Sequence, residues 1–195
     1  MRIYTKNGDN GMTRLLGGAK VNKDHDIVGA LGDLDEVQAV LGMARSECGS
    51  LPDVNAQLLE IERDLWQLMA VVADRDIEQD NNSNVKNKTT IDLSQKTLLL
   101  ESYIDEMTDK LDLAGGFVLP GESKVSAYLD FARTVVRRAE RQIVKIGMGA
   151  SEVQKYLNRL SDFCWALARS LEPSHALSAP KDNKSGYGHQ ISSLD

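Results

Sequence analysis

The chain is poor in cysteine and in aromatic residues. Of its 195 residues only two are cysteine, Cys48 and Cys164, and aromatic residues make up 5%. Two distant cysteines without a CxxC motif argue against a disulfide framework or a structural zinc site, so we interpret both as small buried apolar residues. Leucine, alanine and valine carry most of the apolar character, which favours helices packed on helices.

Long apolar runs and an excess of positive charge are also absent. No apolar segment approaches the roughly 18 residues that a membrane helix needs, and none near the start resembles a secretory signal. The formal net charge of -6 argues against a general nucleic-acid-binding protein. The simplest expectation is a cytoplasmic protein, with a trimmed organellar protein as the alternative.

Five stretches have apolar residues at alternating steps of three and four, which is the periodicity of amphipathic helices. They cover about residues 27–48, 54–72, 93–111, 123–146 and 151–171. Steps averaging about 3.5 residues are typical of the seam of a helical bundle with left-handed supercoiling. We therefore predict an all-α domain over residues 1–172, with a mobile polar loop at 74–92 and a loosely attached tail at 173–195.

The segment from Tyr4 to Lys23 has neither the alternation of a strand nor the repeat of a helix. Glycines let a backbone approach an anion closely, and successive amide groups can form an anion-binding nest. The glycines and candidate donors are Thr5, Lys6, Gly8, Gly11, Thr13, Gly17, Gly18 and Lys23. A phosphate-binding loop over residues 1–26 and a flexible arm are equally weighted interpretations, because the Walker A and dinucleotide-binding motifs are both absent.

The fourth predicted helix carries a charged row beside its apolar face. At about 100° per residue, Arg133, Arg137 and Glu140 fall in this row, and Arg141 lies beside it. Two guanidinium groups one turn apart suit phosphate oxygens. Composition alone nevertheless favours a solvated face with Arg–Glu pairs.

Two other predicted helices offer complementary polar groups. A polar row on the fifth helix consists of Asn158, Asp162, Trp165 and Arg169. This row could line a pocket for a ring and a ribose, although taken alone an amphipathic helix with one interfacial Trp is the more frequent explanation. On the first helix, Asp33, Asp35 and Glu36 could pair with arginines of the same chain or of a neighbouring subunit.

Several segments together resemble the PduO-type ATP:cob(I)alamin adenosyltransferase family. The opening YTKNGDNGMTRLLGG is similar to the family's TKTGDxGxT, and KVNKDHDIVGALGDLDEVQAVLG is similar to RVxKxxxRVEAYGxVDELNxxLG. FVLPG, ARTVVRRAER and YLNRLSDFCWALAR follow in the family's order and spacing, so the likeness extends from about Ile3 to Arg169.

The resemblance implies a five-helix, left-handed up-down bundle that assembles as a homotrimer with active sites between subunits. It implies transfer of the 5′-deoxyadenosyl group of ATP to the cobalt of cob(I)alamin, with Mg²⁺ as cofactor and triphosphate as the second product. A reductase that supplies electrons and a cobalamin-dependent enzyme are further partners that it suggests. No nucleic acid, membrane or dedicated protein metal site is expected.

The resemblance also assigns individual residues. Around the nucleotide and its Mg²⁺ it places Thr5, Lys6, Gly8, Asp9, Gly11, Thr13 and Lys23, while Arg137, Glu140 and Asn158 would hold phosphate and ribose. Arg133 would pair with Asp35 of a neighbouring subunit and so shape the site. Phe117 would lie near the corrin and help to keep the lower axial ligand away from cobalt, which makes cobalt easier to reduce.

Five positions depart from the family pattern. Ile27, Gly29, Gln38, Asp130 and Trp165 stand where the family usually has Arg, Glu, Asn, His and Phe. We interpret the missing Arg and Glu as an ion pair lost as a unit, and we expect Asp130 and Trp165 to affect cobalamin more than ATP. The departures keep open a nucleotide-binding or cobalamin-delivery bundle without turnover. A purely structural bundle is a third alternative, and it would bind no ATP.

Overall fold

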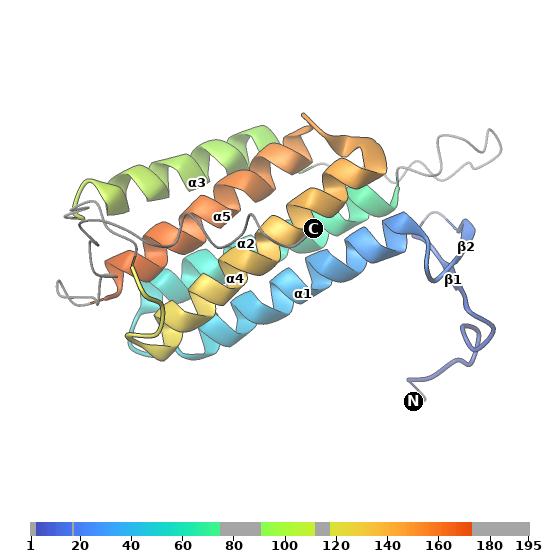
Figure 1. Ribbon diagram of the computed structural model, residues 1–195, viewed down its shortest axis with the longest axis horizontal. Coiled ribbons are helices and arrows are strands. Elements are labelled where there is room, and N and C mark those ends of the chain that lie inside the picture. Colours follow the sequence, from blue (N-terminus) through green and yellow to red (C-terminus); the bar gives the residue numbers. More distant parts are fainter. Residues whose placement is uncertain (1–2, 17, 75–90, 112–117, 173–195) are drawn as a thin grey trace, which may run out of the picture.

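A computed structural model describes residues 3–16, 18–74, 91–111 and 118–172. Five α-helices lie side by side along these ranges (Figure 1): α1 (Asp26–Ser46), α2 (Pro52–Ala73), α3 (Leu93–Thr108), α4 (Lys124–Ile143) and α5 (Glu152–Ser170). The predicted all-α bundle is confirmed, and each predicted helix coincides with an observed one to within a few residues. The tail predicted at 173–195 lies outside the described residues, as do residues 75–90 of the predicted loop.

Local sequence determines where the helices begin and end. α4 starts at a capping box, in which the Ser123 hydroxyl accepts a hydrogen bond from the Ser126 amide and the Ser126 hydroxyl accepts one from the Ser123 amide. α2 begins at Pro52, whose fixed φ suits the first turn of a helix. α4 runs into a π-helical turn, η2 (Val144–Met148), in which Gly147 adopts a φ of 77°.

The core is the seam that the apolar periodicity predicted. α5 packs against α3 and α4, and α1 packs against α4 and α2. The α5 stripe of Val153, Leu157, Leu160, Cys164 and Leu167 is buried, as are Leu129 and Val136 of α4. Cys48 is also buried, so the interpretation of both cysteines as core residues is confirmed.

The opening segment contains a small sheet that the sequence did not indicate. β1 (Met12–Arg14) pairs with β2 (Lys20–Asn22) in antiparallel register, with Thr13 opposite Val21. The hairpin lies at the end of the bundle where α1 begins (Figure 1). The strands are held by their turn, where the Leu15 amide donates to the Ala19 carbonyl at 2.9 Å. No residue of either strand is fully buried, so the sequence lacks the strong apolar alternation that marks a strand, and our prediction of an irregular segment was wrong.

A polar cluster ties α2 to α3. The Lys96 ammonium of α3 lies 2.7 Å from Glu60 Oε1 and 3.0 Å from Asp64 Oδ1 of α2. Asp64 is only 5% exposed, and burial raises the pKa of its carboxyl while Lys96 acts in the opposite direction. Lys96 therefore compensates a buried charge.

None of the described helices has the length and apolar character to cross a membrane.

Replacing Lys96 with Met should lower the free energy of unfolding by about 2 kcal/mol near neutral pH, because the Asp64 carboxylate stays buried without its cation. The pKa of Asp64, already raised by burial, should rise further. Folding favours the protonated form of such a carboxyl, so the deficit should shrink between about pH 7.5 and about pH 5. Urea unfolding at both pH values measures this change.

The matched control for this experiment is Lys110→Met. The ion pair between Lys110 and Glu106 is exposed on both sides, so its loss should change stability by less than about 0.5 kcal/mol. Equal losses in the two variants, or a Lys96→Met deficit that does not vary with pH, would contradict the role assigned to Lys96.

Candidate functional site

The opening loop is a compact series of tight turns with exposed polar side chains. The Asp9 amide donates to the Lys6 carbonyl at 3.3 Å, and the Gly11 amide donates to the Gly8 carbonyl at 3.2 Å. Lys6 and Gly11 have positive φ values of 60° and 79°, a region that favours glycine at the second position. Thr5, Lys6 and Asp9 are exposed on these turns.

Lys23 brings a positive charge onto the same turns. Its amide donates to the Gly11 carbonyl at 2.9 Å, and its side chain lies over Gly8. A Cβ added to Gly8 would lie 3.0 Å from the Lys23 ammonium nitrogen, so glycine at this position leaves room for the end of the Lys23 side chain. The loop thus brings a glycine and a cation close together, which is compatible with binding an anion.

A second set of candidate residues meets between α4 and α5. Glu140 Oε1 of α4 accepts hydrogen bonds from Gln154 Nε2 at 2.8 Å and from Asn158 Nδ2 at 3.3 Å, both on α5. Asn158 Oδ1 in turn accepts from Arg159 Nη1 at 2.9 Å. Glu140 of the row predicted on one helix therefore meets Asn158 of the row predicted on the other, where α4 packs on α5.

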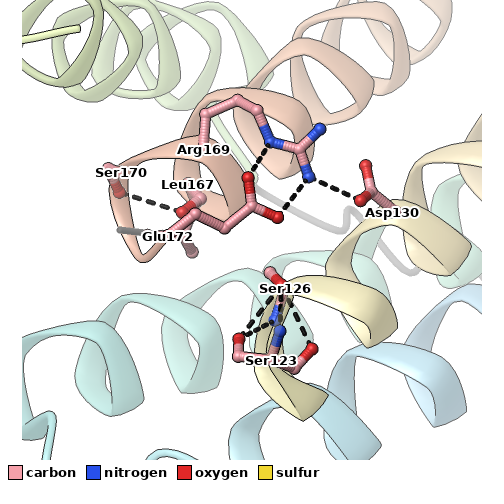
Figure 2. Close-up of polar contacts among 7 residues, drawn as sticks. All are labelled: Ser123, Ser126, Asp130, Leu167, Arg169, Ser170 and Glu172. Atoms are coloured by element: carbon pink, nitrogen blue, oxygen red, sulfur yellow. Dashed lines mark hydrogen bonds and ion pairs between the residues drawn. The ribbon is translucent and has the colours of Figure 1, made fainter. Parts of the chain in front are cut away.

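A buried arginine lies at the other end of the contact between α4 and α5. Figure 2 shows the Arg169 guanidinium between two carboxylates, with Nη2 2.5 Å from Asp130 Oδ2 and Nε 2.8 Å from Glu172 Oε2. Burial raises the pKa of Glu172, and the charge of Arg169 opposes this rise. Asp130, a departure from the family pattern, thus serves as the partner of Arg169.

Arg133 lies on α4 between Asp130 and Glu140. Its side chain is half-buried, and its Nε is buried without a hydrogen-bond partner among the described residues. Burial raises the pKa of the Cys164 thiol to about 12, and the charge of Arg133 acts against this rise, which places Arg133 close to α5. An unpaired guanidinium nitrogen in such a position is costly unless a further partner is present.

The remaining arginines of α4 point in different directions. Arg138 turns to α1, where it pairs with Glu36 and where its Nε lies 3.2 Å from Asp33 Oδ1. Asp35 is left exposed, and it has no ion pair within the part of the chain that the structure describes. Arg137 is exposed too, and its carbonyl accepts a hydrogen bond from Arg141 Nη1.

The two halves of the candidate site do not touch within one chain. No hydrogen bond or ion pair joins Thr5, Lys6, Asp9, Thr13 or Lys23 to α4 or α5 in the described ranges. The Lys6 ammonium lies instead 6.0 Å from the centre of the Tyr4 ring. Phe117, expected near the corrin, falls outside the described residues.

Sequence reasoning did not identify three residues that make polar contacts in this site or beside it. Gln154 lies one turn before Asn158, so extending the polar row backwards by four residues would have found it. Arg138 and Arg159 carried no such signal, because only the packing of α4 on α1 and of α5 on α3 shows which carboxylates they meet.

The fold and these groups define a helical bundle with a glycine-containing opening loop and polar side chains that meet between α4 and α5. The family model for cobalamin adenosyltransferase matches residues 3–171. The chain therefore belongs to the cobalamin adenosyltransferase family. It is 36% identical over 179 residues to the corrinoid adenosyltransferase of Bacillus subtilis, covering 87% of this chain and 86% of that protein.

Other relatives give the same result. The chain is 33% identical to the corrinoid adenosyltransferase MMAB of Homo sapiens, with 86% of this chain and 68% of that protein covered. It spans about half of the corrinoid adenosyltransferase PduO of Salmonella typhimurium, to which it is 37% identical over 87% of its own length. A solved variant of the PduO-type ATP:corrinoid adenosyltransferase from Lactobacillus reuteri, complexed with cobalamin and ATP, superimposes with a TM-score of 0.74 at 33% identity, covering 87% of this chain and 90% of that one.

Replacing Arg169 with Met should lower the free energy of unfolding by about 3 kcal/mol near neutral pH, because two buried carboxylates lose their shared cation. Adding Asp130→Asn should restore part of the loss, since the double variant leaves one charge stranded instead of two. Chemical denaturation of the wild type, the two single variants and the double variant measures the coupling. Strictly additive losses would show that Arg169 does not compensate Asp130.

Proposed function

We propose that this chain transfers the 5′-deoxyadenosyl group of ATP to the cobalt of cob(I)alamin, forming adenosylcobalamin and releasing triphosphate. The observation that carries the proposal is the family match over residues 3–171. The solved relatives complexed with cobalamin and ATP give it further support. The contact of Glu140 with Asn158 adds a local reason, because these two motif positions lie on different helices and yet form a hydrogen bond.

The proposed reaction needs no nucleophilic side chain from the protein, because cob(I)alamin is itself the nucleophile. Cob(I)alamin attacks the 5′ carbon of ATP, a cobalt–carbon bond forms, and the bond to the triphosphate oxygen breaks with its electron pair. The protein aligns the two substrates, offsets the charge of the leaving group and excludes water. Alignment alone can supply roughly 7–11 kcal/mol. The burial of Cys164, with a pKa of about 12, agrees with this division of tasks.

We assign the triphosphate to the opening loop. Thr5, Lys6, Gly8, Asp9, Gly11, Thr13 and Lys23 would surround it, with the two lysines offsetting its charge. Mg²⁺ usually binds one or two carboxylates together with substrate phosphates, and the described residues contain no cluster of three His, Cys, Asp or Glu side chains. The loop suits such a phosphate-borne ion, since Asp9 and the hydroxyls of Thr5 and Thr13 are its oxygen donors. When bound, the ion would add positive charge at the leaving group.

Residues of α4 and α5 would supply the other half of the nucleotide site. Arg137 is exposed there and would bind phosphate oxygens. Glu140 Oε1 is occupied by Gln154 and Asn158, whereas Oε2 takes no hydrogen bond from the described residues. Oε2 is therefore the oxygen that would accept a ribose hydroxyl.

A homotrimer with sites between subunits would join the two halves. Arg133 has a buried Nε without a partner, and Asp35 is exposed without an ion pair within the described chain. Pairing Arg133 of one subunit with Asp35 of the next satisfies both groups. The role of Phe117 beside the corrin, a reductase, a cobalamin-dependent enzyme as recipient and a cytoplasmic location stay predictions.

The reaction is tested directly by supplying reduced cobalamin, ATP and Mg²⁺ and recording the light-sensitive alkylcobalamin spectrum. Arg137→Ala should lower the rate at least about 100-fold while the protein stays folded, because a charge-assisted contact to the leaving group is lost. Arg63→Ala, which removes an exposed arginine on α2, serves as the control.

Two outcomes would contradict this proposal. ATP binding by calorimetry without any alkylation of cobalt would favour a nucleotide-binding or cobalamin-delivery protein. Full activity of Arg137→Ala would show that the phosphates lie elsewhere.

The subunit contact is tested by exchanging its charges. Asp35→Arg and Arg133→Glu should each weaken the oligomer, because each places like charges against each other. The double variant restores one attractive pair and should recover assembly. Sedimentation velocity measures the oligomeric state, and equal dissociation of the single and double variants would rule out this pairing.

A further inference from the structure

Arg159 belongs to the YLNRLSD segment, yet the proposed reaction gives it no task. Its side chain links α3 to the candidate site. Nε lies 2.7 Å from Glu101 Oε1 on α3, and Nη1 donates to Asn158 Oδ1 at 2.9 Å. A weaker ion pair joins Nη1 to Asp162 Oδ2 at 3.6 Å. The Arg159 guanidinium is thus held by Glu101 of α3 and at the same time donates a hydrogen bond to the side-chain amide of Asn158.

This contact determines which way the Asn158 amide faces. An amide has an oxygen that accepts and an NH₂ group that donates, whereas guanidinium only donates. With Oδ1 held by Arg159, the NH₂ group is directed to Glu140 Oε1, at 3.3 Å. A flipped amide would set two donors against each other at Arg159 and two acceptors against each other at Glu140.

Glu140 is oriented by the same chain of contacts. Asn158 and Gln154 both donate to Oε1, which leaves Oε2 facing away from these amides. The order of contacts is therefore Glu101 to Arg159, Arg159 to Asn158, and Asn158 to Glu140, and it crosses from α3 through α5 to α4. Each donor meets one acceptor along this path.

We infer that Arg159, anchored by Glu101, is a positioning residue that sets the orientation of Asn158 and Glu140 for the nucleotide. This inference rests on the proposed function, because it assigns Asn158 and Glu140 to ATP. The Arg159 side chain is 40% exposed, so its ion pairs contribute little to stability. Its main effect is on the geometry of the two residues that it orders.

The first test compares Arg159→Met with Arg45→Met. Arg45 is a matched control, because its Nε lies 2.9 Å from Glu62 Oε1 on a neighbouring helix and its side chain is 34% exposed. Both variants lose one ion pair between helices, and their unfolding transitions should shift by similar small amounts. Calorimetric titration with ATP should show about tenfold weaker binding for Arg159→Met and unchanged binding for Arg45→Met.

The second test asks whether Arg159 acts through Asn158. In an Asn158→Ala background there is no amide to orient, so adding Arg159→Met should weaken ATP binding no further. A full additional loss in the double variant would overturn the inference, because Arg159 would then act by another route. Arg159→Lys should bind ATP with intermediate affinity, since one ammonium replaces the fork that reaches both Glu101 and Asn158.

The two proposals fail in different ways. If the wild type alkylates cobalamin and Arg159→Met binds ATP as tightly as the wild type, the positioning role is wrong and the proposed function stands. If the wild type binds no ATP at all, the proposed function is wrong, and the positioning role of Arg159 is wrong as well because it depends on ATP binding.

Discussion

The packing of α4 on α5 is the contact on which the candidate site depends. A buried seam that includes Leu129, Val136 and Leu157 fixes the rotation of each helix about its own axis. Once that rotation is fixed, the charged row of α4 and the polar row of α5 have to face each other. The Glu140–Asn158 contact follows from this seam, because helical spacing places both residues beside the apolar face.

The arginines of α4 and α5 differ in whether neighbouring carboxylates neutralise them. Arg138 is neutralised by α1, and Arg169 is buried between two carboxylates. Arg133 and Arg137 are left with guanidinium groups that α1 and α5 do not satisfy within the described chain. Neither guanidinium forms an ion pair with a carboxylate of the described residues, which leaves Arg137 available for the proposed contact with phosphate and Arg133 for the proposed contact with Asp35.

The opening loop and the residues between α4 and α5 form the two halves of the proposed site. Gly8 lets the Lys23 ammonium lie against the turns of the loop, and the loop makes no polar contact with α4 or α5 in the described ranges. Each half is incomplete alone, since one offers cations and amides and the other offers Arg137 with an oriented carboxylate. In the proposed homotrimer, a subunit interface would bring these halves together while each chain folds around its own core.

Apolar periodicity alone determined the five helices, the burial of both cysteines and the faces of the two polar rows, because each depends on spacing along a single helix. The motifs indicated the family, because they occur in the family's order and spacing over nearly the whole chain. Spacing could not show that Arg138 meets Asp33, that Arg159 meets Glu101, or that three-residue strands form in the opening loop. Those features depend on which helices become neighbours and on how a turn closes. They were decided by tertiary packing, which brings together side chains as far apart in sequence as Asp33 and Arg138.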